Sequence, residues 1–474
     1  MKVHQIVLLA LLAPILVLAL FFRTCYLGQT GLENDEVANT AVARAIYLTG
    51  WPSIKTEFLT LQQPYVFHPP FGYGIMAGWF WLVRNTSFAA ARLLNVIASI
   101  GALLLIFLFM LRIHRGAALL GTFFIALDGW IVMTNRMNYL ENLQLLLIVP
   151  AMWAYWRATN RPTTLNYALA GLAVGLVVIF KHIGLYLLLG VLAQWLMVRK
   201  HHAGHMCLLG TAAVVIASYE VLMYLTFGTV FYAQQLHQAQ RFFGLAKARG
   251  MDFGVLQALQ IIRERYWIYG TTVATLLVGW PLVTWRYIRA VYGKTPSAEP
   301  TLLAWAVGGL AFAAMSRLKS PHYLMLWLIP LYLYLALEAA HRLTGRRLLW
   351  VPVLVVAFTA TNVFTWHVRF GQAHGDVLRN SAAYITTNLP PDAVVATETC
   401  LGLLIDQPYI SFDKNTLVER LLRERQATHM AVYTSRTTIV GDLPSAVQQA
   451  SANCITLAIF RGFKDEVRIC KLNY

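Results

Sequence analysis

Long apolar stretches recur along the first three quarters of the chain and are separated by short polar segments. A helix needs about 20 consecutive apolar residues to cross a bilayer. Two of the stretches are shorter and are typical of a broken hairpin, those at 166–180 and 184–198. The full pattern predicts eleven spans, at residues 6–24, 92–111, 116–134, 140–156, 166–180, 184–198, 206–227, 268–288, 301–316, 321–339 and 348–366.

The first loop and its flanks add two expectations. Residues 6–24 follow Lys2 as a signal peptide would, but they end in Phe21, Phe22 and Arg23 without a small-residue cleavage pattern. We therefore expect an uncleaved first span. Residues 72–84 are rich in Trp and Phe but too short to span, which predicts a helix lying in the membrane interface.

Beyond Trp366 the pattern changes, and residues 367–474 predict a separate small α/β domain. It carries no phosphate-binding loop and no nucleophile elbow, so we expect an accessory role, towards the acceptor. Residues 1–366 form the predicted transmembrane domain, with residues 25–91 as its first outer loop. The tail predicts helices at 376–388 and 415–426, strands at 393–397 and 430–434, and a hairpin of 455–461 with 466–472.

Composition agrees with a polytopic membrane protein. Of the 474 residues, 58% are hydrophobic and 12% are charged, about half the charged fraction of a soluble domain. The net charge of +17 does not indicate nucleic-acid binding, because residues 366–474 are nearly balanced, with 11 Lys and Arg against 10 Asp and Glu. The excess lies in the membrane part, much of it in short connections between spans.

These connections orient the chain. With a cytoplasmic N-terminus, the cytoplasmic connections are basic or mildly basic, as the positive-inside rule requires. The other face receives the long loop 25–91, the 136–141 connection, the 228–267 loop and the tail. Polar mass on one face, without an inverted repeat, favours an enzyme or receptor over a transporter. The five cytoplasmic connections are 112–115, 157–165, 199–205, 289–300 and 340–347.

The five cysteines do not have the spacing of a metal site. Cys400, Cys454 and Cys470 fall in the tail, where one disulfide would leave one thiol over. The sequence does not choose the pair.

Acidic residues stand at two outer span ends. Asp35 and Glu36 follow the first span within Glu33-Asn34-Asp35-Glu36, and Glu141 opens the fourth. Each has a simple structural interpretation, as a helix cap or as an acid that complements the helix dipole. Carboxylates at a membrane surface are costly unless solvated or used.

Cationic and aromatic side chains occupy the same face. Each of these side chains, taken alone, also has a simple structural explanation. It would mark a boundary between loop and helix, snorkel to the membrane interface, or belong to a turn that flanks the membrane. Together with the acids they suit transfer of a sugar from a phosphate carrier, because a carboxylate takes the hydroxyl proton and cations stabilise the leaving phosphate. Tyr73, Trp79 and Trp81 are placed to line a lipid or sugar path. The candidate phosphate and substrate ligands are His68, Arg136, Lys181, His182, Arg317, Lys319, His322 and Tyr323.

The order of these motifs carries a resemblance to a known family. Over about residues 25–335 the chain resembles the protein O-mannosyltransferase and aminoarabinose transferase superfamily of C-type glycosyltransferases. The motifs are, in order, Asp35-Glu36, His68-Pro69-Pro70-Phe71, Ala91 to Asn95, Arg136 to Glu141, Lys181 after a span with Gly171 and Gly175, and Lys319 before Pro321-His322-Tyr323-Leu324.

The resemblance implies an all-α polytopic bundle of the GT-C type and a sugar donor on polyprenyl or dolichyl phosphate. Transfer would invert the anomeric centre. Asp35 matches the general base and Glu141 the second acidic position, while Lys181 and Lys319 fall in segments that face the donor phosphate. We expect Asp35, Glu36 and Glu141 to be the catalytic residues.

Two positions depart from the aminoarabinose transferases. Ala38 stands where they carry an Arg three residues after the first acid, and His68 where they carry a Lys before the two prolines. A neutral imidazole binds phosphate less well than an ammonium, so donor contacts are expected to shift to Arg136, Lys181 or the 228–267 loop. The compact length and the α/β tail fit a bacterial member that acts on envelope glycans such as lipopolysaccharide.

The resulting prediction is a multi-pass plasma (inner) membrane enzyme whose active site and tail domain face the extracytoplasmic side. Its partners would be the bilayer, a polyprenyl-phosphate sugar and a protein, lipid A or glycan acceptor, without nucleic acid. No obligatory cofactor or metal is expected, because no tight ligand spacing accompanies His68, Glu33, Asp35 and Glu36.

Two other function classes remain open. A transporter or flippase of a lipid-linked sugar would need charged or broken helices in mid-membrane, whereas the polar residues lie at span ends. A sensor or assembly factor would leave Asp35 and Glu141 without a use. Loss of activity on Asp35→Asn, with folding and donor binding kept, separates the enzyme from both.

Overall fold

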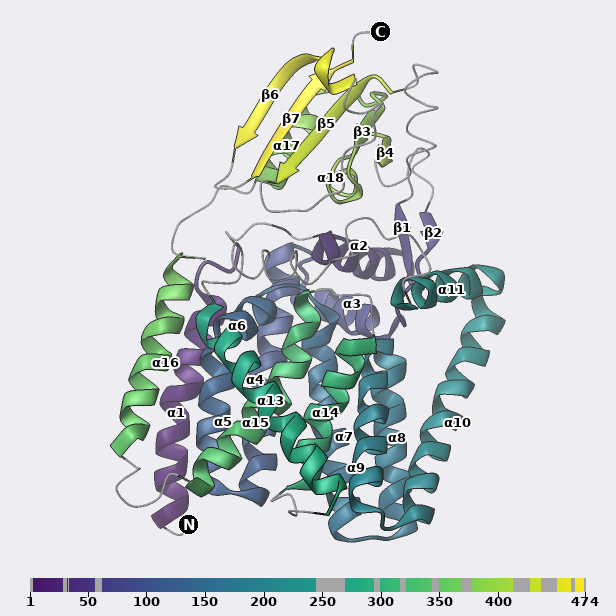
Figure 1. Cartoon of the computed structure of the whole chain (residues 1–474). Coiled ribbons are helices and arrows are strands. Elements are labelled where there is room, and N and C mark those ends of the chain that lie inside the picture. Colours follow the sequence, from purple (N-terminus) through teal and green to yellow (C-terminus); the bar gives the residue numbers. More distant parts are fainter. Residues whose placement is uncertain are drawn as a thin grey trace.

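The computed structural model describes most of the chain as a bundle of helices with a small sheet beyond one end of it (Figure 1). The N-terminus lies at the opposite end of the bundle from the sheet (Figure 1). The described residues are 3–28, 32, 34–55, 62–243, 269–293, 299–315, 321–342, 349–368, 377–411, 427–435, 450–461 and 465–472.

Within the described residues, ten of the eleven apolar stretches fall mainly on one bundle helix each, and the stretch 116–134 falls on two, α5 and α6. Among the described residues, α4, α10 and α15 are each long and apolar enough to cross a membrane, and the bent pair α5 and α6 makes a fourth candidate. The count of eleven spans therefore stays a prediction. The bundle helices are α1 Val3–Thr24, α4 Phe88–Ile113, α5 Arg115–Leu127, α6 Gly129–Arg136, α7 Leu140–Asn160, α8 Thr164–Phe180, α9 Tyr186–Val198, α10 His202–Phe227, α13 Gly270–Val291, α14 Pro300–Met315, α15 Leu324–Arg342 and α16 Trp350–Trp366.

The bend of 62° between α5 and α6 is fixed by buried polar groups. Asp128 caps α6 by accepting a bond from the Ile131 amide at 3.0 Å. Its other oxygen accepts from Tyr332 Oη and Thr272 Oγ1, each at 2.7 Å. Arg23 donates to two carbonyls at the end of α5, which the break leaves without helical partners. A buried carboxylate is costly unless hydrogen-bonded, so this network stabilises the bend that aims α6 at the sheet-side end.

Glycine allows α8 to pack closely on α10. A methyl group at Gly171 would overlap the carbonyl oxygen of Leu208, and one at Gly175 would lie 2.8 Å from Val215 Cβ. The two glycines therefore let the helix backbones approach each other. This contact fixes α8, which ends next to Lys181.

Short elements gather at the sheet-side end of the bundle, where α2, α3, α11, β1 and β2 are labelled in Figure 1. The helix predicted at 72–84 is α3, which begins directly after Pro69 and Pro70; its place in a membrane interface stays a prediction. Proline suits a helix start because its fixed φ is already helical and its missing N–H is not needed there. These elements are α2 Asn34–Thr49, β1 Ser53–Lys55, β2 Gln62–Pro64, α3 Phe71–Val83, η1 His182–Leu185, α11 Thr229–Phe243 and η4 Pro321–Tyr323.

The described residues after 376 form the C-terminal cap, a mixed sheet of order β4-β3-β5-β7-β6 with two helices. β3 pairs in parallel with β4 and β5, while β7 is antiparallel to β5 and β6. The predicted first helix, both strands and the hairpin are confirmed; the helix predicted at 415–426 lies outside the described residues. The cap elements are α17 Val377–Asn388, β3 Val395–Thr397, α18 Thr399–Gly402, β4 Tyr409–Ser411, β5 His429–Ser435, β6 Ile455–Arg461 and β7 Asp465–Lys471.

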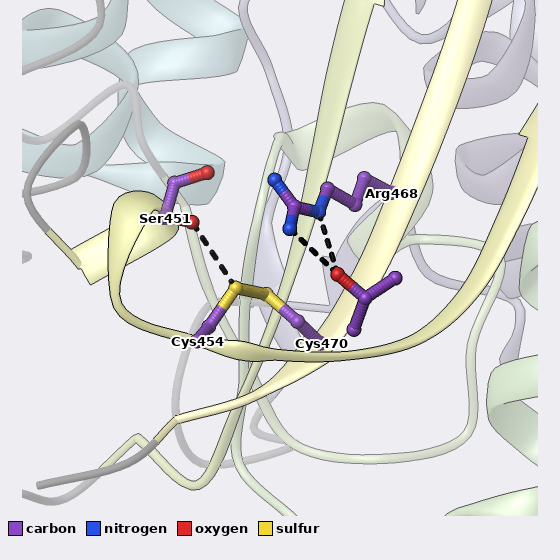
Figure 2. The surroundings of a disulfide bond; sticks show 5 residues. Ser451, Cys454, Arg468 and Cys470 are labelled. Atoms are coloured by element: carbon purple, nitrogen blue, oxygen red, sulfur yellow. Dashed lines mark hydrogen bonds between the residues drawn. A yellow bond between two sulfur atoms is a disulfide. The ribbon is translucent and has the colours of Figure 1, made fainter.

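A disulfide joins Cys454 to Cys470 across the start of the β6–β7 hairpin (Figure 2). The Arg468 guanidinium lies beside it and donates to Thr456 Oγ1 at 2.8 and 2.6 Å. The structure thus selects one of the pairs that the sequence left open.

The cap packs on the end of the bundle. Leu32, Val37 and Phe88 of the membrane part share one apolar cluster with residues of the cap. Arg379 of α17 donates to the Gly28 carbonyl at 2.9 Å, and its guanidinium lies over the Phe88 ring. These contacts hold the cap beside α2.

Candidate active site

Four polar side chains from four parts of the chain meet at the cap-side end of the bundle. Glu141 Oε1, in the first turn of α7, lies 2.6 Å from Lys181 Nζ and 3.3 Å from His322 Nε2. His322 Nε2 also lies 3.6 Å from Oδ2 of Asp35, in the first turn of α2. The structure therefore brings together two predicted acids and two predicted phosphate ligands.

The two acids differ in exposure. The Glu141 side chain is fully buried, whereas the Asp35 side chain is 60% exposed. The imidazole of His322 lies within reach of both carboxylates. Asp35 is therefore open to a ligand from outside, while Glu141 is used within the protein to hold Lys181 and His322.

Lys181 is fixed by its backbone and by its surroundings. It follows the last residue of α8, and Gln144 Nε2 donates to its carbonyl oxygen at 2.7 Å. Its ammonium lies 5.4 Å from the centre of the Tyr323 ring, a distance typical of a cation–π contact. The charge is thus held over an aromatic face and aimed at Glu141.

Aromatic rings orient His322. Its ring stacks on Tyr139, with centroids 4.5 Å apart and planes 18° from parallel, and meets Tyr323 edge-on at 4.5 Å. These contacts leave the imidazole little rotational freedom. Tyr139 and Tyr323 therefore set the direction of Nε2 towards the carboxylates.

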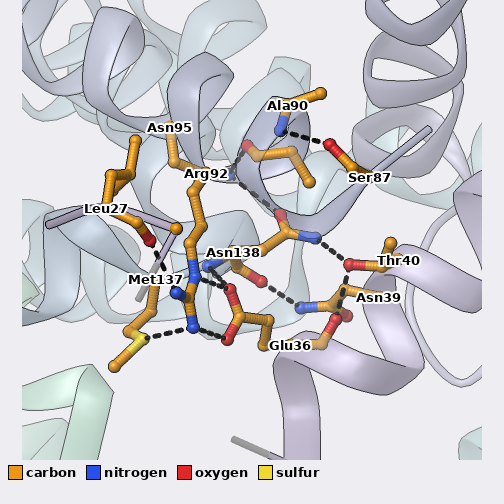
Figure 3. A network of polar contacts seen from close by, with 12 residues as sticks. Leu27, Glu36, Asn39, Thr40, Ser87, Ala90, Arg92, Asn95, Met137 and Asn138 are labelled. Carbon is orange, nitrogen blue, oxygen red and sulfur yellow. Dashed lines mark hydrogen bonds and ion pairs between the residues drawn. The ribbon is translucent and has the colours of Figure 1, made fainter. Parts of the chain in front are cut away.

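Glu36 lies in a different network from its neighbour Asp35 (Figure 3). Its two carboxylate oxygens accept from Arg92 Nε at 2.6 Å and Nη2 at 2.7 Å, and Oε1 also accepts from the Asn138 amide at 3.2 Å. Both Glu36 and Arg92 are fully buried. Asn138 in turn donates to Thr40 and accepts from Asn95, each within 3 Å. The network ties α2 and α4 to the 137–139 connection, which leads directly to Glu141.

His68 faces the same site from the loop before α3. Burial lowers its pKa well below 6.5, and the Lys181 ammonium acts in the same direction, against the opposing effect of Glu141. His68 is therefore neutral near pH 7. Nearby, burial and, to a smaller extent, the charge of Asp35 raise the pKa of Tyr65 to about 12. Tyr65 thus keeps its hydroxyl proton beside Asp35.

The remaining predicted ligands lie elsewhere or are not described. His182 Nε2 lies 3.2 Å from Glu220 Oε1 of α10, next to the cluster. Arg136 is fully buried and donates to the Phe22 carbonyl at 2.7 Å, which places it in the packing between α6 and α1. Arg317 and Lys319 lie outside the described residues.

Sequence reasoning missed several supporting residues. Tyr139 and Asn138 stand inside the noted segment 136–141, but their neutral side chains gave no charge signal. Gln144 lies one helical turn after Glu141. Its amide side chain on the same helix face as Glu141 was the signal in the sequence that could have identified it. Arg92 was noted only within a motif, although a buried arginine requires an acidic partner.

Comparison with known proteins agrees with the arrangement. Residues 7–238 match the profile of the family dolichyl-phosphate-mannose-protein mannosyltransferase. Among solved structures, ArnT from Cupriavidus metallidurans bound to undecaprenyl phosphate matches with a TM-score of 0.63 and 14% identity, over 99% of this chain and 98% of that one. The predicted resemblance is confirmed, and the chain has the C-type glycosyltransferase fold.

Two further C-type structures share this fold. The archaeal oligosaccharyltransferase AglB from Archaeoglobus fulgidus, with an inhibitory peptide and a dolichol-phosphate, matches with a TM-score of 0.60 and 12% identity, over 96% of this chain and 73% of that one. Arabinofuranosyltransferase AftD from Mycobacteria matches with a TM-score of 0.52 and 14% identity, over 98% and 40%. No curated protein sequence matches this chain.

Proposed function

We propose that the protein is an integral-membrane, inverting glycosyltransferase that moves a sugar from a polyprenyl-phosphate carrier to an acceptor hydroxyl. The observation that carries this proposal is the exposed carboxylate of Asp35 next to the buried cluster of Glu141, Lys181 and His322. An exposed base beside a fixed cation suits a reaction in which a proton is taken up and a phosphate departs.

In the proposed reaction, the bond that forms is matched by one that breaks. The acceptor oxygen bonds to the anomeric carbon while the bond from that carbon to the phosphate oxygen breaks. Asp35 takes the hydroxyl proton, and the electron pair leaves with the polyprenyl phosphate. An ammonium has three N–H donors, of which Glu141 accepts one, so Lys181 keeps donors for the phosphate.

The cap supports an extracytoplasmic site on the plasma (inner) membrane. Disulfides such as Cys454–Cys470 persist in oxidising compartments, and the cap that carries this one packs on the site end. At the other end, His114 contacts His341, so the basic connection 112–115 and the described residues 340–342 of the basic connection 340–347 lie together there. Basic connections favour the cytoplasmic side.

The proposed partners are a polyprenyl-phosphate sugar and a protein, lipid A or glycan acceptor. The ligands of structures with the same fold support the carrier: ArnT was solved with undecaprenyl phosphate and AglB with a dolichol-phosphate. We further propose that transfer needs no obligatory metal, since the Lys181 ammonium supplies positive charge for the leaving phosphate.

A panel of radiolabelled polyprenyl-phosphate sugars, offered to membranes that contain the wild type, tests the function. We expect label to leave the carrier for one sugar, and the rate to stay within about twofold in EDTA. Membranes without the protein are the control. Failure with every donor, with folded protein and acceptor present, would favour the transporter or flippase. Activity that EDTA abolishes and one divalent ion restores would overturn the metal-free step.

Lys181 provides a sharper test of donor phosphate stabilisation. The single change Lys181→Met would leave Glu141 buried without its cation and should impair folding. The double variant Lys181→Met/Glu141→Gln removes both charges together. We expect the double variant to fold but to lose about 10²- to 10³-fold in kcat/KM, as for loss of one anion-stabilising donor.

Thermal unfolding in detergent and donor kinetics measure the two effects. Lys200→Met serves as the matched control, because it makes the same change at an exposed lysine of the 199–205 connection and leaves the buried pair in place. Wild-type kcat/KM in a folded double variant would rule out a role for Lys181 in donor stabilisation.

A further inference from the structure

Helix α11 stands beside the segment that carries His68 and bonds to its backbone. Gln234 Oε1 accepts from the Val66 amide at 2.7 Å, and its Nε2 donates to the Pro64 carbonyl at 2.9 Å. Gln235 Nε2 donates to the Val66 carbonyl at 2.7 Å. Two adjacent side-chain amides thus make three bonds to one short stretch of main chain.

Residues 64–66 bond to α11 along the edge at which a third strand would pair with the β1–β2 ribbon. In an extended strand, alternate residues direct their N–H and C=O groups to the same side. Pro64 and Val66 bond to α11, whereas the intervening Tyr65 amide donates to the Pro52 carbonyl at 2.9 Å, on the side where β2 pairs with β1. The amides of Gln234 and Gln235 therefore take the place of strand backbone.

Side-chain packing fixes the same stretch to α10 and α11. Val66 is fully buried and shares an apolar cluster with Tyr219, Met223 and Phe231. The Phe67 ring meets the ring of His237 edge-on, with centroids 5.9 Å apart. Residues 64–67 consequently follow the position of α11.

His68 is the next residue and is followed by two prolines. Because each proline has a fixed φ, the chain between Phe67 and α3 has little freedom. A methyl group at Gly72 would lie 2.8 Å from Leu140 and 3.2 Å from Phe180, so the start of α3 packs on the residues that directly precede Glu141 and Lys181. The charges of Lys181 and Glu141 also act on the imidazole, which agrees with a position at the candidate active site. The location of the imidazole is thus set by α11 on one side and by α3 on the other.

We propose that Gln234 and Gln235 are positioning residues that hold His68 at the active site through the backbone of residues 64–66. We call the three bonds from Gln234 and Gln235 to Pro64 and Val66 the clip. The effect of the clip on catalysis rests on the proposed function, but the existence of the clip does not. A displacement of about 1 Å at a reacting site can cost about 10²-fold in rate. The double variant Gln234→Leu/Gln235→Leu is therefore expected to lose about 10- to 100-fold in kcat with little change in melting temperature.

Amide hydrogen exchange of the full-length protein tests the clip without any substrate. Loss of the bonds to Gln234 should speed exchange of the Val66 amide at least about fivefold. Gln234→Glu is the conservative variant, because a carboxylate still accepts from Val66 but cannot donate to Pro64. It should keep the Val66 amide protected and retain more activity than the double variant. Gln240→Leu, the same change on the same helix, is the matched control.

The outcomes separate the two claims. Faster exchange with lowered kcat supports the proposal. An unchanged exchange rate of the Val66 amide would refute the clip. Faster exchange with a wild-type kcat would refute its role in positioning His68. If the double variant does not fold, the single variants Gln234→Leu and Gln235→Leu give the same readouts. Absence of wild-type transfer from every donor would defeat the proposed function, while the exchange result would still decide the clip.

Discussion

Asp35→Asn is expected to reduce transfer by about 10²- to 10⁴-fold while leaving the protein folded. The amide keeps the shape of the carboxylate but cannot accept the acceptor's proton. The side chain is 60% exposed, and among the described residues its ion contact is with His322 at 3.6 Å, so folding should hardly depend on its charge. Initial rates with the radiolabelled donor, together with thermal unfolding in detergent, measure both properties.

Asp392→Asn is the matched control for this change. It makes the same substitution at an exposed carboxylate of the cap, in the turn after Pro390 and Pro391. Its rate should equal that of the wild type. Donor binding by the Asp35 variant should also persist, because Lys181 is unchanged. Full transfer by Asp35→Asn would assign the proton to another group.

Glu36→Gln is expected to have the opposite effect, namely loss of stability. The change leaves the fully buried Arg92 without its anionic partner, which typically costs about 3–5 kcal/mol. The bond that Glu36 Oε1 accepts from the Asn138 amide would also weaken. Melting temperature and the yield of monodisperse protein should both fall, before any effect on chemistry is considered.

A double-mutant cycle distinguishes bracing from catalysis at Glu36. The variant Glu36→Leu/Arg92→Leu removes both buried charges and should regain part of the stability that either single change loses. The coupling energy between the two positions then reports the ion pair. If Glu36→Gln melted like the wild type but lacked activity, Glu36 would belong to the chemistry instead.

The contrast between Asp35 and Glu36 could not be predicted from their order in the sequence. Adjacent residues on a helix point about 100° apart, so one of them can face the core while the other faces outward. Which residue does so depends on Arg92 and Asn138, which lie about 56 and 102 positions away. The sequence supported a catalytic role for both acids; their different surroundings appear only in the folded chain.

Long-range partners explain the other differences. The disulfide pair depends on the register of β6 on β7, which places Cys470 opposite Thr456, two residues after Cys454. The contacts of Gln234 with Pro64 and Val66 join neutral groups about 170 residues apart, so no charge or periodicity signalled them. His322, by contrast, was predicted as a ligand, but its position between Asp35 and Glu141 required the fold.

The sequence by itself determined the helices and the hairpin of the cap, because apolar periodicity and local turn residues depend on near neighbours along the chain. The order of its motifs carried the resemblance to C-type glycosyltransferases. It also supplied every member of the cluster formed by Asp35, Glu141, Lys181 and His322. Only the tertiary structure decided which acid is exposed, which is neutralised by a cation and which loop is clipped by α11. Burial and ion pairing are properties of segments that meet in space, and local sequence does not contain them.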